Sequence, residues 1–196
     1  MKKQDITILA PSKEPQDLQG SFPGMRIINP VQIVNQHEEL HYAVCKAVKD
    51  VTTEFFHIYD NDDTLPNLPE SFPNVGIIFG DIWVSYHGDK KCYPISPWTF
   101  KEHCHFPQLV HRAICRTKDA QRILKEVAHL PILTEWWLYA HLARDYGYFY
   151  DPDVIMHWDK KDTGLHTKSQ EVIANTQALF DQTYPHFSKK THAKPK

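Results

Sequence analysis

Three aspartates follow an apolar and aromatic run in the stretch TTEFFHIYDNDDTLP, residues 52–66. Asp60 and Asp62 are two positions apart, so on an extended chain their side chains project to the same side. Two adjacent carboxylates repel each other unless a cation lies between them. Hard divalent ions such as Mg²⁺ and Mn²⁺ prefer oxygen ligands and bridge to phosphates. The segment therefore indicates a metal site; the alternative is a solvated loop in which the same acids cap turns.

A second group of metal-ligating residue types occurs in KEHCHFPQLVHR, residues 101–112. It contains His103, Cys104, His105 and His111. On an extended chain, His103 and His105 project to one side and Cys104 to the other. No second ligand pair follows at the spacing of a structural zinc site, so this pattern does not favour zinc.

The composition is that of a chain able to bury a core, because 41% of its 196 residues are hydrophobic. We expect a single compact catalytic domain over residues 1–185 and a basic, flexible tail over residues 186–196. The net charge of −2 argues against a general nucleic-acid binder. No run approaches the roughly 18 apolar residues of a membrane span, and the N-terminal apolar run is too short for a signal peptide. We therefore expect a cytoplasmic protein without a membrane anchor, whose four cysteines are free thiols.

Elements that position these residues can be predicted from periodicity. Short β-branched runs predict strands at residues 5–10, 25–31 and 53–60. Residues 35–50 have helical spacing, with Asn35 as the N-cap. Residues 75–95 are expected to form two strands joined by a turn at His87-Gly88-Asp89.

The second half of the chain is predicted to be mainly helical. Helix-like segments occupy residues 107–129, with Thr117 as a cap, and a clear helix runs from a cap at Thr134 to a stop at Gly147. A strand or strand pair follows at residues 148–158, and a last helix is expected at residues 167–182. This order predicts an α/β fold with a mostly parallel central sheet flanked by helices and a small antiparallel hairpin. Ligands of such sheets gather at the carboxyl ends of the strands, where the aspartates lie.

The stretch VNQHEELHYAVCKAVKDVTTEFFHIYDNDDTLP, residues 34–66, resembles the centre of the GT-A glycosyltransferases, particularly family 2. In that family an asparagine opens a helix with small residues, and the next strand ends in a D-x-D-D-x-L-x-P-like segment. A later Gly-Asp and a helix that opens with acids and ends at glycine complete the pattern. The matching positions here are Asn35, Ala43, Ala47, Asp60, Asp62, Asp63, Leu65, Pro66, Gly80, Asp81, Glu135, Leu138, Leu142 and Gly147.

The resemblance implies a GT-A-like, Rossmann-like fold and a transfer of a hexose or pentose from a nucleotide-sugar, most simply a UDP-sugar. The donor would be bound at the ends of the first and third strands, at the helix that begins with asparagine, and by one lysine. The residues are Pro11, Ser12, Asn35, Asp60 and Lys168. A divalent Mn²⁺ or Mg²⁺ ion would be bound by Asp62 together with His157 or His166. The outcome expected from the family is inversion at the anomeric carbon.

The acceptor side of the implied site depends on the helix that begins at Thr134. The acid pair of the family is Thr134-Glu135 here, so Glu135 would be the general base that deprotonates the acceptor hydroxyl. Asp81 and Trp136 would bind the acceptor, although Trp136 and Trp137 point to different sides and one of them is expected in the core. His105 and His111 would shape the same pocket.

The acceptor itself is left open between a glycan, a small molecule and a hydroxylated base in DNA, as some phage enzymes use. The basic tail would favour DNA, whereas the near-neutral total charge disfavours it. Two other function classes remain: a metal-dependent phosphoryl enzyme acting through Asp60, Asp62 and a histidine, and a nucleotide-binding module without catalysis.

Overall fold

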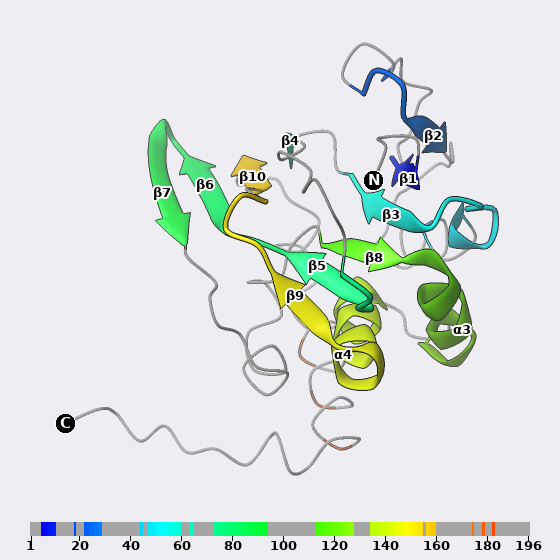
Figure 1. Cartoon of the computed structure of the whole chain (residues 1–196). Coiled ribbons are helices and arrows are strands. Elements are labelled where there is room, and N and C mark those ends of the chain that lie inside the picture. Colours follow the sequence, from blue (N-terminus) through cyan, green and yellow to red (C-terminus); the bar gives the residue numbers. More distant parts are fainter. Residues whose placement is uncertain are drawn as a thin grey trace.

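The computed structural model describes residues 5–10, 18, 22–28, 44, 47–59, 63–64, 73–93, 113–127, 134–154, 156–159, 174, 178 and 182. These residues include two sheets and the helices α3 and α4 (Figure 1). Within this described part, no helix is both long and apolar enough to cross a membrane.

The larger sheet has six strands in the order β2-β1-β3-β8-β5-β9. Their bounds are Ile6–Leu9 (β1), Arg26–Ile28 (β2), Phe55–Ile58 (β3), Ile77–Phe79 (β5), Ile114–Arg116 (β8) and Tyr148–Tyr150 (β9). The strand β8 runs antiparallel to both of its neighbours, and the other pairs are parallel. The mostly parallel central sheet predicted from the sequence is therefore confirmed. Strands β1, β3, β5 and β8 are buried along their whole length, as expected for strands covered on both faces.

The smaller sheet has four strands in the order β4-β10-β6-β7. Their bounds are Asp63–Thr64 (β4), Ile82–Tyr86 (β6), Asp89–Tyr93 (β7) and Met156–Asp159 (β10). The hairpin of β6 and β7 turns at His87 and Gly88, whose φ angles are both positive, at 49° and 89°. Positive φ at both central residues is the signature of a two-residue hairpin turn, so the predicted turn is confirmed.

Two helices, α3 (Thr117–Val127) and α4 (Thr134–Tyr146), pack against each other on one face of the six-stranded sheet (Figure 1). The predicted stop of α4 is confirmed, because Gly147 follows it with a φ of 77°. The predicted cap of α3 is wrong as a side-chain cap. The Thr117 hydroxyl is buried and makes no hydrogen bond to any described group, and the Thr117 amide instead donates to the carbonyl of Glu54 at 2.9 Å.

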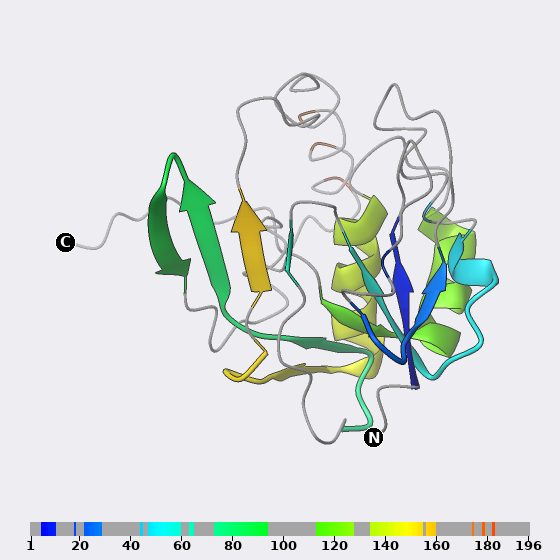
Figure 2. The same ribbon diagram turned by 90° about the horizontal axis from the view of Figure 1, so that it is seen from above.

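Two predictions about strands are corrected by the structure. Residues 114–116 form β8 rather than a helix-like segment, because they complete hydrogen-bond ladders with β3 and β5. The two strands expected over residues 75–95 are three, since the first run is divided at Gly80 and Asp81 into β5 and β6. At that point the chain leaves the larger sheet and enters the smaller one (Figure 2).

Candidate functional site

The carboxyl ends of β1 and β3 lie side by side, as the sequence predicts for residues that bind one ligand. Leu9 pairs with Ile58, and the Tyr59 amide donates to the Leu9 carbonyl at 2.7 Å. The next residues along the chain are Pro11 after Ala10 and Asp60 after Tyr59. Pro11, Ser12 and Asp60 lie outside the described residues; the residues that precede them, Ala10 and Tyr59, lie at this edge.

The acid segment is brought beside the late strand that carries His157. Strand β4 pairs antiparallel with β10, with His157 opposite Thr64 and Trp158 opposite Asp63. Opposite residues of such a pair have Cα atoms about 4.5–5.5 Å apart. Asp62, which precedes this strand in the sequence, lies outside the described residues. Two segments that the resemblance assigns to one metal site are thus neighbours in space.

The first turn of α4 lies at the same end of the sheet as these segments. The amide of Gly76, just before β5, donates to the carbonyl oxygens of Tyr146 and Gly147, at 3.1 and 3.0 Å, so the end of α4 adjoins the start of β5. The helix therefore runs back from the carboxyl edge of the sheet, and Figure 2 shows its first turn at the end toward which β1 and β10 point. Glu135 is in this turn, where the helix dipole favours a carboxylate.

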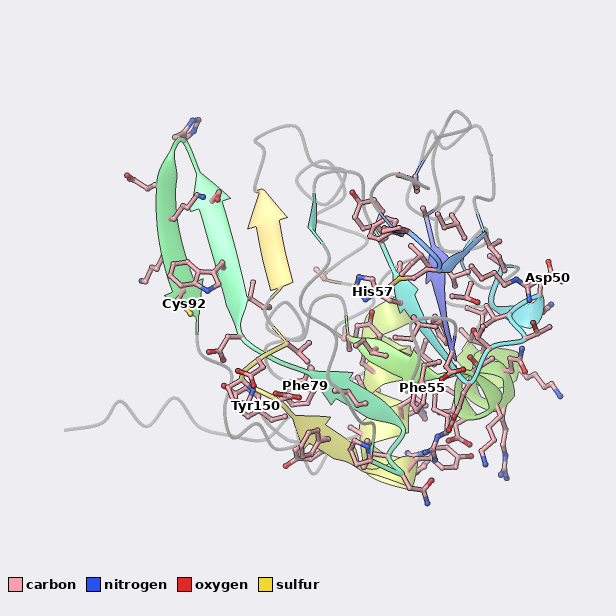
Figure 3. All side chains as sticks on the ribbon, turned by 45° about the horizontal axis from the view of Figure 1, so that its top comes forward. Asp50, Phe55, His57, Phe79, Cys92 and Tyr150 are labelled. Atoms are coloured by element: carbon pink, nitrogen blue, oxygen red, sulfur yellow. The ribbon has the colours of Figure 1, made fainter. Side chains whose placement is uncertain are left out.

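Asp81 and Tyr150 are joined where the two sheets meet. The Tyr150 hydroxyl donates to Asp81 Oδ1 at 2.7 Å, although 69 positions separate the two residues in the chain. Burial first, and then this hydrogen bond, raise the pKa of Tyr150 to about 12, so the phenol remains a donor at neutral pH. Phe79 packs beside Tyr150, with ring centroids 6.1 Å apart (Figure 3). The hydrogen bond from Tyr150 therefore orients the Asp81 carboxylate, and Phe79 packs against the ring of Tyr150.

One rung of the smaller sheet connects this junction to the acid segment. His157 is opposite both Thr64 and Trp83, and Trp83 is opposite Cys92, so these four residues occupy successive strands at one level. Burial and then the carboxylate of Asp81 raise the pKa of the Cys92 thiol. The Cys92 side chain is partly buried.

The donor types of this region fit the predicted divalent ion, since carboxylate oxygens are the ligands that Mg²⁺ and Mn²⁺ prefer. Among the side chains that the structure describes, no group of three His, Cys, Asp or Glu residues could hold a metal ion. The predicted ligands Asp62 and His166 are not among the described residues, and His157 is described by its backbone alone. Metal binding by these residues stays a prediction.

Several other candidates fall outside the described residues: Asn35, His103, Cys104, His105, His111 and Lys168. The predicted domain boundary at residue 185 also falls outside them. For Glu135 and Trp136 the structure describes the backbone of α4 and not the side chains. Trp137 is buried in the core, which confirms that one of the two adjacent tryptophans is a packing residue.

Sequence reasoning missed Tyr150 and Cys92. Tyr150 ends the run YFY and precedes Asp151, a pattern that predicts a strand end and not a partner for Asp81. Its role depends on the parallel pairing of β5 with β9, which places Phe79 opposite Tyr150. The hairpin register places Cys92 opposite Trp83, two positions from Asp81, and this register was predictable once the turn at Gly88 was recognised.

No protein-family model and no curated protein matches the chain. Among solved structures, it is similar to a glycosyltransferase involved in the glycosylation of the major capsid of PBCV-1, with 12% identity and a TM-score of 0.45 over 86% of this chain and 98% of that one. It is also similar to a mycobacterial protein, with 14% identity and a TM-score of 0.46 over 88% of this chain and 74% of that one. Similarities at this level do not establish a shared family or activity.

Proposed function

We propose that the protein is a glycosyltransferase that moves a sugar from a nucleotide-sugar to an acceptor hydroxyl, with inversion at the anomeric carbon. The observation that supports this most is the pairing of β4 with β10 beside the carboxyl ends of β1 and β3. This pairing joins an acid-rich segment to a histidine-bearing strand where an α/β sheet binds its ligands.

In this proposal the donor is a UDP-sugar bound along the ends of β1 and β3. Asp60 faces its ribose or the metal, and Asp62 binds Mn²⁺ or Mg²⁺ together with His157 or His166. The ion would stabilise the charge of the departing nucleoside diphosphate. Among the donor-binding residues, Lys168 would contact a phosphate as a point charge.

The acceptor hydroxyl would be deprotonated by Glu135 in the first turn of α4. The helix dipole at this position favours the ionised carboxylate that a base needs. Asp81, held by Tyr150, would accept a hydrogen bond from the acceptor, and Trp136 would pack against it. A neutral glycan or small molecule suits such a carboxylate better than a polyanion does, since Asp81 repels phosphates.

Donor binding is tested by thermal shift with UDP-, GDP-, CMP- and dTDP-sugars, each with and without Mn²⁺. We expect one nucleotide to raise the melting temperature of the parent only when metal is present. The shift should be lost in Asp62→Ala and kept in Asp50→Ala, a matched variant of an exposed aspartate before β3. A panel without any shift, or a shift unaffected by Asp62→Ala, would reject the proposed donor site.

Catalysis is tested with Glu135→Gln. This variant should keep the metal-dependent donor shift but lose transfer by roughly 10²–10⁴-fold, the usual contribution of a general base. Release of nucleoside diphosphate in the presence of candidate acceptors measures the rate. Equal rates in the parent and in Glu135→Gln would exclude Glu135 as the base, and binding without turnover in the parent would identify a non-catalytic nucleotide-binding module.

A further inference from the structure

Among the strands that the structure describes, β9 is an edge of the six-stranded sheet, and it exposes aromatic side chains. It pairs with β5 on one side and ends the strand order on the other. Tyr148 is 37% exposed and Phe149 is 40% exposed, and they are the large hydrophobic residues most exposed in the described part of the chain. Figure 2 shows β9 along the outer border of the sheet.

Charged residues protect other edges of the two sheets. Strand β2 exposes Arg26, and strand β7 exposes Asp89, Lys90 and Lys91. Charges, and lysines in particular, are a common means by which proteins prevent edge strands from pairing with other chains. The sequence of β9 is Tyr-Phe-Tyr and has no charge, so this edge lacks that protection.

The two exposed aromatics of β9 lie on opposite faces of the sheet, because successive strand residues alternate. Tyr148 is stacked on Phe79, with ring centroids 5.8 Å apart, whereas Phe149 is in register with Ile78. A partner lying on one face would cover only one of them. A strand added along the edge would flank both, and it would also pair with the backbone of β9.

The charges around β9 favour a second copy of the same chain as that added strand. At its start lie Arg144, whose guanidinium donates to the Asp145 carboxylate at 2.7 Å, and Arg122, which donates to the Tyr146 hydroxyl at 3.4 Å, so two arginines outnumber the one carboxylate there. At its end lie Asp151 and Asp153. Antiparallel self-pairing brings the start of each strand beside the end of its partner, so the arginines of one copy approach the aspartates of the other.

We propose that β9 pairs antiparallel with β9 of a second copy, about a two-fold axis at Phe149. Phe149 then lies opposite Phe149 of the other copy, and Tyr148 opposite its Tyr150, which are favourable cross-strand aromatic pairs. The two six-stranded sheets become continuous. A three-residue strand buries less than the roughly 800 Å² per partner of a standard interface, so the dimer is reversible and depends on concentration.

The first test is sedimentation velocity over a range of protein concentrations. We expect the parent to shift from monomer to dimer and Phe149→Lys to remain a monomer. Glu54→Lys, which places lysine at an exposed site at the amino end of β3, should dimerise like the parent. Circular dichroism checks that both variants are folded. A parent that stays monomeric, or a dimer that tolerates Phe149→Lys, overturns the proposal.

The second test exchanges the charges at the ends of β9. Arg144→Glu and Asp153→Lys should each weaken self-association, because like charges then meet across both symmetry-related contacts. An equimolar mixture should restore dimers, since every contact in the mixed dimer pairs opposite charges. No restoration on mixing would exclude this antiparallel register. Slow hydrogen exchange of β9 amides in a monomer would instead show that another segment of the same chain covers the edge, which also overturns the proposal.

Discussion

Among the glycines that the structure describes, Gly80 is the position at which one added methyl group should disturb the molecule most. A Cβ atom built there would lie 1.8 Å from the carbonyl oxygen of Val154 and 2.5 Å from that of Asp151. Both are backbone atoms, and they are held in place: the Val154 amide donates to Asp151 at 3.0 Å, and the Asp151 amide donates to Phe79 at 2.9 Å. Gly80→Ala therefore requires the backbone to move rather than a side chain to rotate.

The expected cost follows from these distances. Cβ contacts under 3.0 Å essentially never occur, so the 1.8 Å approach must widen by more than 1 Å. Overpacking costs typically about 1–3 kcal/mol, and a backbone obstacle places Gly80→Ala at the upper end, about 3 kcal/mol. For a domain of this size each kcal/mol lowers the melting temperature by about 2–4 °C, which predicts a loss of about 6–12 °C.

A matched glycine distinguishes crowding from backbone strain. Gly24 has a φ of +78°, and nothing lies within 4 Å of its added Cβ. Gly24→Ala therefore carries only the left-handed strain of about 1–2 kcal/mol. Melting followed by circular dichroism should place Gly80→Ala clearly below Gly24→Ala. If Gly80→Ala melts at the same temperature or higher, the close approach of the two sheet connections is refuted.

Three further predictions concern single side chains. Replacing Tyr150 by Phe should remove the step near pH 12 from the tyrosinate absorbance titration. Because the fold raises the pKa of this phenol, the protonated Tyr150 adds to the unfolding free energy of the parent below about pH 10, and that contribution is lost as the pH rises toward 12. Gln121→Ala should lower the unfolding free energy by about 1–2 kcal/mol in urea titrations, because its amide donates to the carbonyls of Val48 and Val51 at 3.0 and 3.1 Å; Gln121→Glu, which removes the donors and adds an acceptor, should lower it at least as far. Burial raises the pKa of Cys115, so iodoacetamide should label it only after unfolding; labelling of the native protein would contradict its burial.

Elements with a strong local pattern could be predicted from the sequence. The β-branched run of β1, the turn of the β6–β7 hairpin and the stop of α4 at Gly147 each depend on neighbouring residues, and the structure confirms them. Strand β8 could not be predicted, because its three residues are a strand only through pairing with β3 and β5. The division between β5 and β6 could not be predicted either, because both strands are apolar and contain β-branched residues.

The candidate site likewise has one part that the local sequence predicts and one part that depends on long-range pairing. The aspartates after β3 were recognisable, because a buried strand that ends in acids is itself a chemical signal. The pairing of their segment with β10 has no local signal, since β4 has two residues and exists through its partner. The resemblance proposed His157 as a ligand, and the backbone now places it opposite Thr64. Tyr150 had neither signal and was found only through its hydrogen bond to Asp81.

The junction between the sheets explains how the two halves of the proposed site keep their relative position. Phe79 pairs with Tyr150 in one sheet and Ile82 pairs with Met156 in the other, so β5 crosses in two residues while β9 crosses in five. The longer connection folds back on the shorter one, and the carbonyl oxygens of Asp151 and Val154 lie so close to Gly80 that no Cβ atom fits there. Any change in the length of the longer connection would therefore slide β10 along β6, and would move His157 relative to the acid segment without altering a single predicted ligand.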